Sequence, residues 1–165
     1  MARKVFFSFH FANDFWRTQQ VRQMGTLEGQ SLATANAWEE VKRKGDAAVK
    51  KWIDDQLYGK SCVVVLIGSE TASRPYVLYE IRKGWNEGKG VLGIRIDRLL
   101  GTDGKSSSAG ANPFTSITIA NGMKSLANIV PLKNPTGPDS KSVYSSISTN
   151  IEAWIEEAIK IRASY

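Results

Sequence analysis

The chain has 165 residues, of which 42% are hydrophobic and 23% are charged, an ordinary balance for one globular domain with its own core. This composition argues against a chain that is disordered throughout. The formal net charge of +6 favours anionic partners, but nucleic acid is not singled out, because the densest basic stretch, residues 42–51, has no aromatic side chain to stack on bases.

Strands and helices alternate along the predicted chain. A short Val- and Phe-rich segment, "KVFFSF", has the composition of a strand, and the helix after it has Asn13 or Asp14 as a cap and Gly25 as its end. Residues 26–37 are small and polar, and a short edge strand is expected somewhere among them. In chain order, the predicted elements are a strand at 4–9, helices at 13–25 and 45–60, a strand at 61–67, a helix at 73–87, strands at 90–96 and 128–132, and a helix at 144–164.

The pattern of these elements predicts the fold class. The helix at 45–60 is amphipathic, with Asp46 as its cap, and the basic side chains around it are expected to form a solvated face. Two of the strands are continuous apolar runs, which indicates a parallel sheet covered by helices on both faces. The Gly-, Ser- and Pro-rich stretches at 101–114 and 133–142 indicate surface loops, because neither flank is long enough for a second domain. We therefore expect one α/β domain over residues 1–165, with ligands bound outside the carboxyl ends of its strands.

Glu80 is the first candidate for chemistry, because it lies on the helix that follows the buried strand. In the segment "RPYVLYEIRKG", Tyr76 and Glu80 are one turn apart and lie together on the flank of the apolar helix face. A carboxylate in this position is partly desolvated and can point into a cleft near the strand ends. The alternative is a surface glutamate that pairs with Lys83, three residues further on.

The remaining candidates are more ambiguous. His10 is the single histidine and Cys62 the single cysteine, which excludes a structural zinc site and an internal disulfide. His10 is either a hydrogen-bonded structural residue or an acid–base group. Trp38 is a core residue or a ligand stacker, and Asn112, which precedes a proline, is typical of a turn. The hydrolase elbow, the P-loop and the dinucleotide-binding glycine motif are all absent from the sequence.

The sequence shows no recognisable signal peptide or membrane-spanning segment. The first 15 residues lack the long apolar region and the small-residue cleavage site of a signal peptide. The longest apolar run, residues 62–67, is too short to span a bilayer, and a free cysteine inside it indicates a packing role in a reducing compartment. We therefore expect a cytoplasmic protein.

Several segments together resemble a known family. These are "VFFSFH" followed by Asp14, then "AWEE", "VVVLIGSET", "YVLYEIRKG" and "NPF". In this order they resemble the TIR-like domain of ThsB from the Thoeris antiphage defence system, best over residues 3–24 and 36–114. TIR enzymes commonly carry Trp-x-x-x-Glu with a catalytic glutamate, and here Tyr76 stands in place of the tryptophan before Glu80.

The resemblance implies a flavodoxin-like sheet and an enzyme that breaks the nicotinamide–ribose bond of NAD, with NAD as substrate and no separate cofactor or metal. It implies a cyclic ADP-ribose-type product that acts on a separate effector protein, a phage-derived trigger, and neither nucleic acid nor membrane as partner. By the same resemblance Glu80 is catalytic, and the substrate-binding residues are Phe7, Ser8, His10, Tyr76 and Asn112.

The aromatic residues near the first strand favour cyclisation over hydrolysis. Phe6, Phe7, Phe9, Phe11 and Tyr76 are expected near the site, where they would keep water away from the ribose. Two alternatives stay open: a non-enzymatic TIR interaction module, and an enzyme resembling nucleoside deoxyribosyltransferases, which also have a flavodoxin-like fold with a sugar-facing glutamate.

Overall fold

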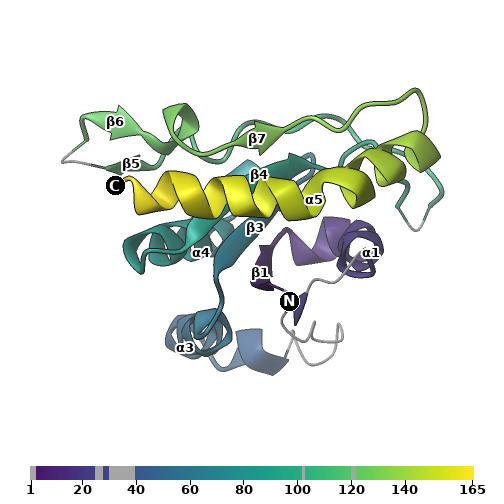
Figure 1. Ribbon diagram of the computed structural model, residues 1–165. Coiled ribbons are helices and arrows are strands. Elements are labelled where there is room, and N and C mark those ends of the chain that lie inside the picture. Colours follow the sequence, from purple (N-terminus) through teal and green to yellow (C-terminus); the bar gives the residue numbers. More distant parts are fainter. Residues whose placement is uncertain (1–2, 25–27, 30–39, 102, 120–121) are drawn as a thin grey trace.

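The computed structural model describes residues 3–24, 28–29, 40–101, 103–119 and 122–165. Its centre is a five-stranded parallel sheet in the order β2-β1-β3-β4-β7 (Figure 1). This is the strand order of flavodoxin-like folds, so the predicted α/β class is confirmed. The strands are β1 (Lys4–Ser8), β2 (Glu28–Gly29), β3 (Cys62–Ile67), β4 (Gly90–Arg95) and β7 (Leu132–Lys133).

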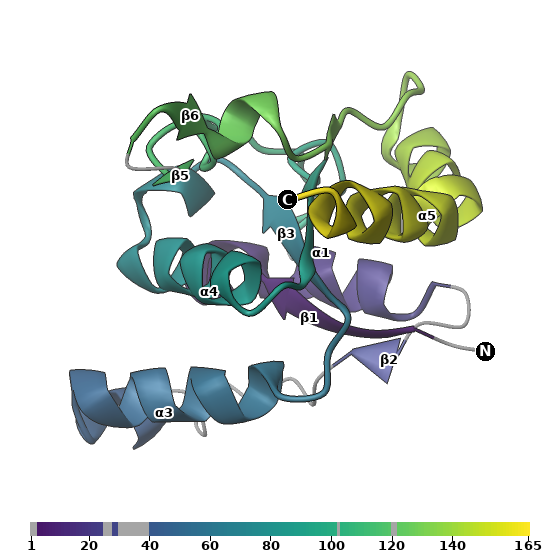
Figure 2. The same ribbon diagram turned by 60° about the vertical axis from the view of Figure 1, so that its left-hand side comes forward.

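Helices cover both faces of the sheet (Figure 2). One face carries α1 (Phe11–Arg22) and α5 (Ser140–Ala163), and the opposite face carries α3 (Asp46–Leu57) and α4 (Pro75–Asn86). The smaller elements are the antiparallel pair β5 (Thr118–Ile119) and β6 (Lys124–Ser125) and the 3-10 turns η1 (Thr71–Ser73) and η2 (Leu126–Asn128). Among the described residues, no helix is both long enough and apolar enough to cross a membrane.

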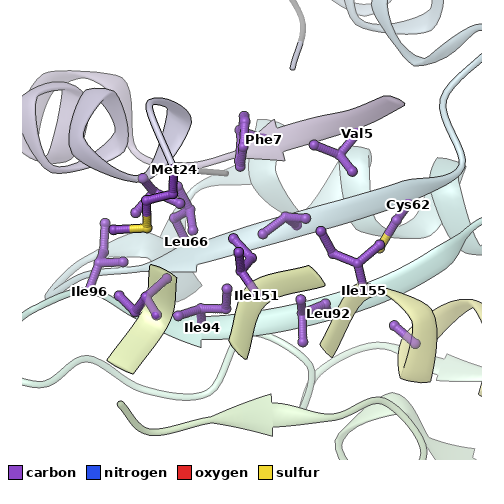
Figure 3. Close-up of a cluster of buried hydrophobic side chains, with 14 of the residues drawn as sticks. Val5, Phe7, Met24, Cys62, Leu66, Leu92, Ile94, Ile96, Ile151 and Ile155 are labelled. Atoms are coloured by element: carbon purple, nitrogen blue, oxygen red, sulfur yellow. The ribbon is translucent and has the colours of Figure 1, made fainter. Parts of the chain in front are cut away.

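Alternation along the strands divides the core into two clusters. All six residues of β3 are buried, as expected for a strand with helices on both sides. In β1, the side chain of Phe7 lies with those of α1 and α5 (Figure 3), whereas Phe6 lies with those of α3 and α4. Successive residues of a strand point to opposite faces, so Ser8 shares its face with Phe6 and points toward α4.

The first helix and the last one begin earlier than predicted. Helix α1 starts at Phe11 with His10 as its N-cap, so Asp14 is not a cap but a buried residue that pairs with Arg17. Helix α5 starts at Ser140 because the Asp139 side chain caps it by accepting a hydrogen bond from the backbone amide of Ser142. This cap was not predicted from the sequence, because the Gly-, Ser- and Pro-rich composition of residues 133–142 indicated a loop.

Other boundaries differ for similar local reasons. Gly45, not Asp46, is the N-cap of α3. Strand β7 overlaps the predicted 128–132 strand only at Leu132, because the chain before it forms η2 at Leu126–Asn128 and a turn. The strand expected within residues 26–37 corresponds to β2, while Trp38 lies outside the described residues.

Candidate active site

A cavity lies at the topological switch point of the sheet, where the order of the strands reverses. In the strand order, β1 and β3 are neighbours, with β2 beyond one and β4 beyond the other, and the helices that follow them, α1 and α4, cover opposite faces (Figure 1). Ligands of such sheets bind at this switch point, outside the carboxyl ends of the strands. The cavity has a volume of about 550 Å³ and is lined by Phe9, His10, Phe11, Ala12, Phe15, Lys42, Arg74, Pro75, Tyr76, Val77 and Glu80.

Glu80 forms the acidic part of this lining. Its side chain is buried in the second turn of α4, and its Oε1 accepts a hydrogen bond of 2.6 Å from the Ser8 hydroxyl. Burial raises the pKa of the Glu80 carboxyl to about 8, although the hydrogen bond from Ser8 acts in the opposite direction. Lys83 pairs instead with Glu87, at 3.6 Å, so Glu80 is not the surface glutamate of the alternative interpretation.

Local sequence explains how Ser8 and Glu80 meet. Ser8 is the last residue of β1, on the face that points toward α4. Helix α4 starts directly after the extended residue Arg74, with Pro75 at its first position, a favoured arrangement because proline has no amide to leave unpaired there. The apolar side chains of Val77 and Ile81 pack on the sheet, which leaves Glu80 at the border of the core beside the end of β1.

His10 lines the same cavity as Glu80. It caps α1 without a side-chain hydrogen bond, and its Nδ1 is 4.0 Å from Oε2 of Glu70. Burial lowers the pKa of the His10 imidazole, and the positive charges of Arg74 and Lys42 lower it further, against the opposite effect of Glu70. The imidazole is therefore neutral at neutral pH, so it can accept or donate a hydrogen bond to a bound ligand.

Tyr76 also lines the cavity, one turn before Glu80. Its hydroxyl donates a 3.0 Å hydrogen bond to Oδ1 of Asp46, the first residue of α3. This bond joins α3 to α4 and orients the tyrosine ring at the side of the cavity.

Three of the expected substrate-binding residues, Phe7, Ser8 and Asn112, are not part of the cavity lining. Ser8 is fully buried and contacts the site through its hydrogen bond to Glu80. Phe7 is 1% exposed and packs between the sheet, α1 and α5 (Figure 3), because strand alternation turns it away from Ser8. Asn112 is in the loop before β5, where its Oδ1 accepts a 2.8 Å hydrogen bond from the amide of Phe114. This is the turn geometry that its position before a proline predicts.

Sequence reasoning missed part of the aromatic side of the cavity. Phe9, Phe11 and Phe15 form a row, with ring centroids 5.9 Å apart for the first pair and 4.8 Å for the second. Phe6, by contrast, belongs to the core. The spacing of four residues between Phe11 and Phe15 puts both on one helix face, and it could have identified Phe15 once α1 was known to begin at Phe11.

A buried ion pair supports the loop beside this site. Asp14 and Arg17 are 1% and 6% exposed, with Nη1 of the arginine 3.1 Å from Oδ1 of the aspartate. The Arg17 Nε donates to the carbonyl of Leu99 at 2.8 Å, and Nη2 donates to the carbonyl of Lys105 at 3.0 Å. Arg17 thus fastens the segment after β4 to α1. In the described part of the chain, no cluster of three or more His, Cys, Asp or Glu residues could hold a metal ion.

Comparison with known proteins supports the resemblance seen in the sequence. The family model for the TIR-like domain of the Thoeris protein ThsB matches residues 6–100, a range that contains Ser8, His10, Tyr76 and Glu80. A protein of Bacillus cereus (strain MSX-D12) with the name "Putative cyclic ADP-D-ribose synthase ThsB1" is 40% identical over 120 residues. The match covers 69% of this chain and 62% of that relative, so the chain spans less than two thirds of the relative's length.

Proposed function

The chain belongs to the ThsB TIR-like family of the Thoeris system, and from this premise we propose that it is an NAD-consuming enzyme. It breaks the nicotinamide–ribose bond of NAD and closes the remaining ADP-ribose into a cyclic isomer, which acts on a separate effector protein. The observation that carries this proposal is the buried carboxyl of Glu80, held by Ser8 at the switch point of the sheet. The name of the Bacillus cereus relative supports the same product class.

The chemistry requires little more than a positioned carboxylate. When the bond between the ribose C1 and the nicotinamide nitrogen breaks, its electron pair neutralises the pyridinium, so the leaving group needs no proton. The positive charge that develops on the ribose is stabilised by the ionised Glu80. Although burial raises the pKa of Glu80, a bound pyridinium cation favours the ionised form, and Ser8 stabilises that form by donating its hydroxyl hydrogen.

The aromatic side of the cavity supports cyclisation. Phe9, Phe11 and Phe15 form an apolar part of the lining that also contains Glu80, and such a surface limits the water that could attack the ribose. A nucleophile that belongs to the same ligand then reacts at a high effective concentration. The new bond forms at the carbon that nicotinamide has left, so the product has the mass of NAD minus nicotinamide.

The test is nicotinamide release and product mass, measured for purified protein and for extracts of phage-challenged cells that contain it. We expect Glu80→Gln to abolish nicotinamide release without loss of fold, because the change is nearly isosteric. The matched control is Glu87→Gln, which replaces a glutamate of 39% side-chain exposure just after α4 and should keep wild-type turnover. Turnover retained in Glu80→Gln would remove this carboxylate from the mechanism.

Other outcomes separate the alternatives. Linear ADP-ribose as the only product, at a time when the defence is active, would disprove cyclisation but not NAD cleavage. Transfer of deoxyribose between a deoxynucleoside and a free base would favour the deoxyribosyltransferase alternative. Consumption of neither substrate, even in challenged cells, would favour the non-enzymatic interaction module.

A further inference from the structure

Arg74 presents an unsatisfied donor in the wall of the cavity. The residue lines the cavity directly before α4, and its Nε is buried with no hydrogen-bond partner among the described residues. Its nearest carboxylate belongs to Glu70, whose Oε2 is 3.8 Å from Nη2 and already accepts a hydrogen bond from Asn13. Because Glu70 is 53% exposed, this ion pair is weak. The Arg74 side chain as a whole is 41% exposed, but its Nε is buried, and buried donors without partners are rare and costly. An anion bound in the cavity would satisfy this donor.

More positive charge converges on the same side. Lys42 lines the cavity as well, and its charge and that of Arg74 both act on the imidazole of His10, so both cations lie near this imidazole. The N-terminus of α4, at Pro75, is part of this wall and adds the positive end of a helix dipole. The cavity therefore has a cationic side, an aromatic side and one buried carboxyl, that of Glu80.

We propose that Arg74, assisted by Lys42, binds the pyrophosphate of the dinucleotide and so positions its nicotinamide ribose against Glu80. This inference rests on the proposed function for the identity of the ligand. A guanidinium suits the role because its planar fork of parallel N–H donors binds two phosphate oxygens at once, whereas a lysine ammonium acts as a point charge. The pyrophosphate would then provide the binding energy that brings the uncharged ribose to the carboxylate.

The first test measures binding of ADP and adenosine to the purified protein by titration calorimetry. ADP carries the pyrophosphate and lacks nicotinamide, so its binding requires no catalysis. We expect Arg74→Gln to weaken ADP binding on the order of 10- to 100-fold, with adenosine binding unchanged, and Arg74→Lys to recover part of the loss. The wild-type affinity for ADP should also fall as the salt concentration rises.

The matched control is Arg82→Gln, which removes an arginine from the exposed side of the same helix. Because Lys42 assists Arg74 in the proposal, Lys42→Gln should also weaken ADP binding, and its control is Lys44→Gln, an exposed lysine of the same basic stretch. Equal ADP affinity in wild type and Arg74→Gln would overturn the inference, and so would equal weakening of ADP and adenosine, because that would indicate a merely structural role.

A kinetic test separates this inference from the proposed function. Nicotinamide riboside contains the same scissile bond as NAD but no phosphate. If Arg74 grips the pyrophosphate, Arg74→Gln lowers kcat/KM for NAD and leaves that for nicotinamide riboside unchanged, so the ratio between the two substrates falls. A wild-type protein that binds ADP through Arg74 but cleaves no NAD would refute the proposed function and leave the anion site standing.

Discussion

The pH dependence of stability in a Glu80→Gln variant tests the electrostatics of the site most directly. The folded protein holds the pKa of Glu80 at about 8, compared with the usual 4.5, because the carboxyl is buried between the end of β1 and the second turn of α4. Folding therefore favours the protonated carboxyl. The stability that comes from this preference is fully present below pH 4.5 and is lost as the pH rises through about 8. Glutamine cannot ionise, so the stability of the Glu80→Gln variant does not fall in this pH range for this reason.

The size of the effect follows from the two pKa values. At about 1.4 kcal/mol per pKa unit, the difference corresponds to an upper limit on the order of 5 kcal/mol. Water that enters the cavity and small movements of the helix reduce this limit. Relative to wild type, Glu80→Gln should therefore gain several kcal/mol in unfolding free energy between pH 5 and pH 9, because only the wild-type carboxyl must ionise in a buried position.

Urea unfolding at several pH values between 5 and 9 measures this difference. Comparison of the two proteins at each pH cancels the contributions of groups that both contain, such as Asp14. Glu87→Gln serves as the control, because its side chain is 39% exposed, and its curve should run parallel to that of wild type. If the Glu80→Gln curve is also parallel to wild type, Glu80 is not desolvated as the structure indicates, and the reasoning fails.

Three further predictions concern the surroundings of Glu80. Ser8→Ala removes the hydrogen bond that lowers the pKa of Glu80, so the rise of kcat/KM with pH should move to higher pH; an unchanged profile would contradict this role. Tyr76→Trp should keep most turnover, whereas Tyr76→Ala should lose much of it. Because Tyr76 is only partly buried, Tyr76→Ala should cost less stability, measured by its melting temperature, than truncation of a fully buried aromatic, which costs about 3–5 kcal/mol. Equal losses of turnover in both variants would argue against the motif analogy. Arg17→Met strands the buried Asp14 and should destabilise the protein by about 3–5 kcal/mol in urea unfolding, and a loss under about 1 kcal/mol would show that the pair is dispensable.

Periodicity predicted the fold class and placed Glu80 at the border of the core, but it left open whether Glu80 was a surface glutamate. Apolar runs at 61–67 and 90–96 required a sheet buried on both faces, and the helical spacing after 73 placed Glu80 one turn from Tyr76 at the edge of the apolar face. These inferences succeeded because both depend on the repeat of a single strand or helix, which is a local property. The family resemblance, through motifs in the same order, led to the same residue.

Which residues adjoin the cavity was decided by the tertiary structure. In the segment from Val5 to Phe7 every residue is apolar, and since both faces of the sheet are buried, the sequence does not say which face adjoins the ligand. The structure assigns Phe7 to the core under α1 and α5, and Ser8 to the opposite face, beside Glu80.

The cationic wall and the raised pKa of Glu80 were likewise beyond the sequence. Lys42 belongs to a basic stretch for which the sequence predicted a solvated surface. Arg74 precedes a helix, and nothing in the local sequence indicated a role for it. They meet His10 and Glu80 only because α1, α4 and the segment before α3 come together at the ends of β1 and β3. Desolvation of a carboxyl and convergence of charge are sums over neighbours distant in the chain, so only the packed structure decides them.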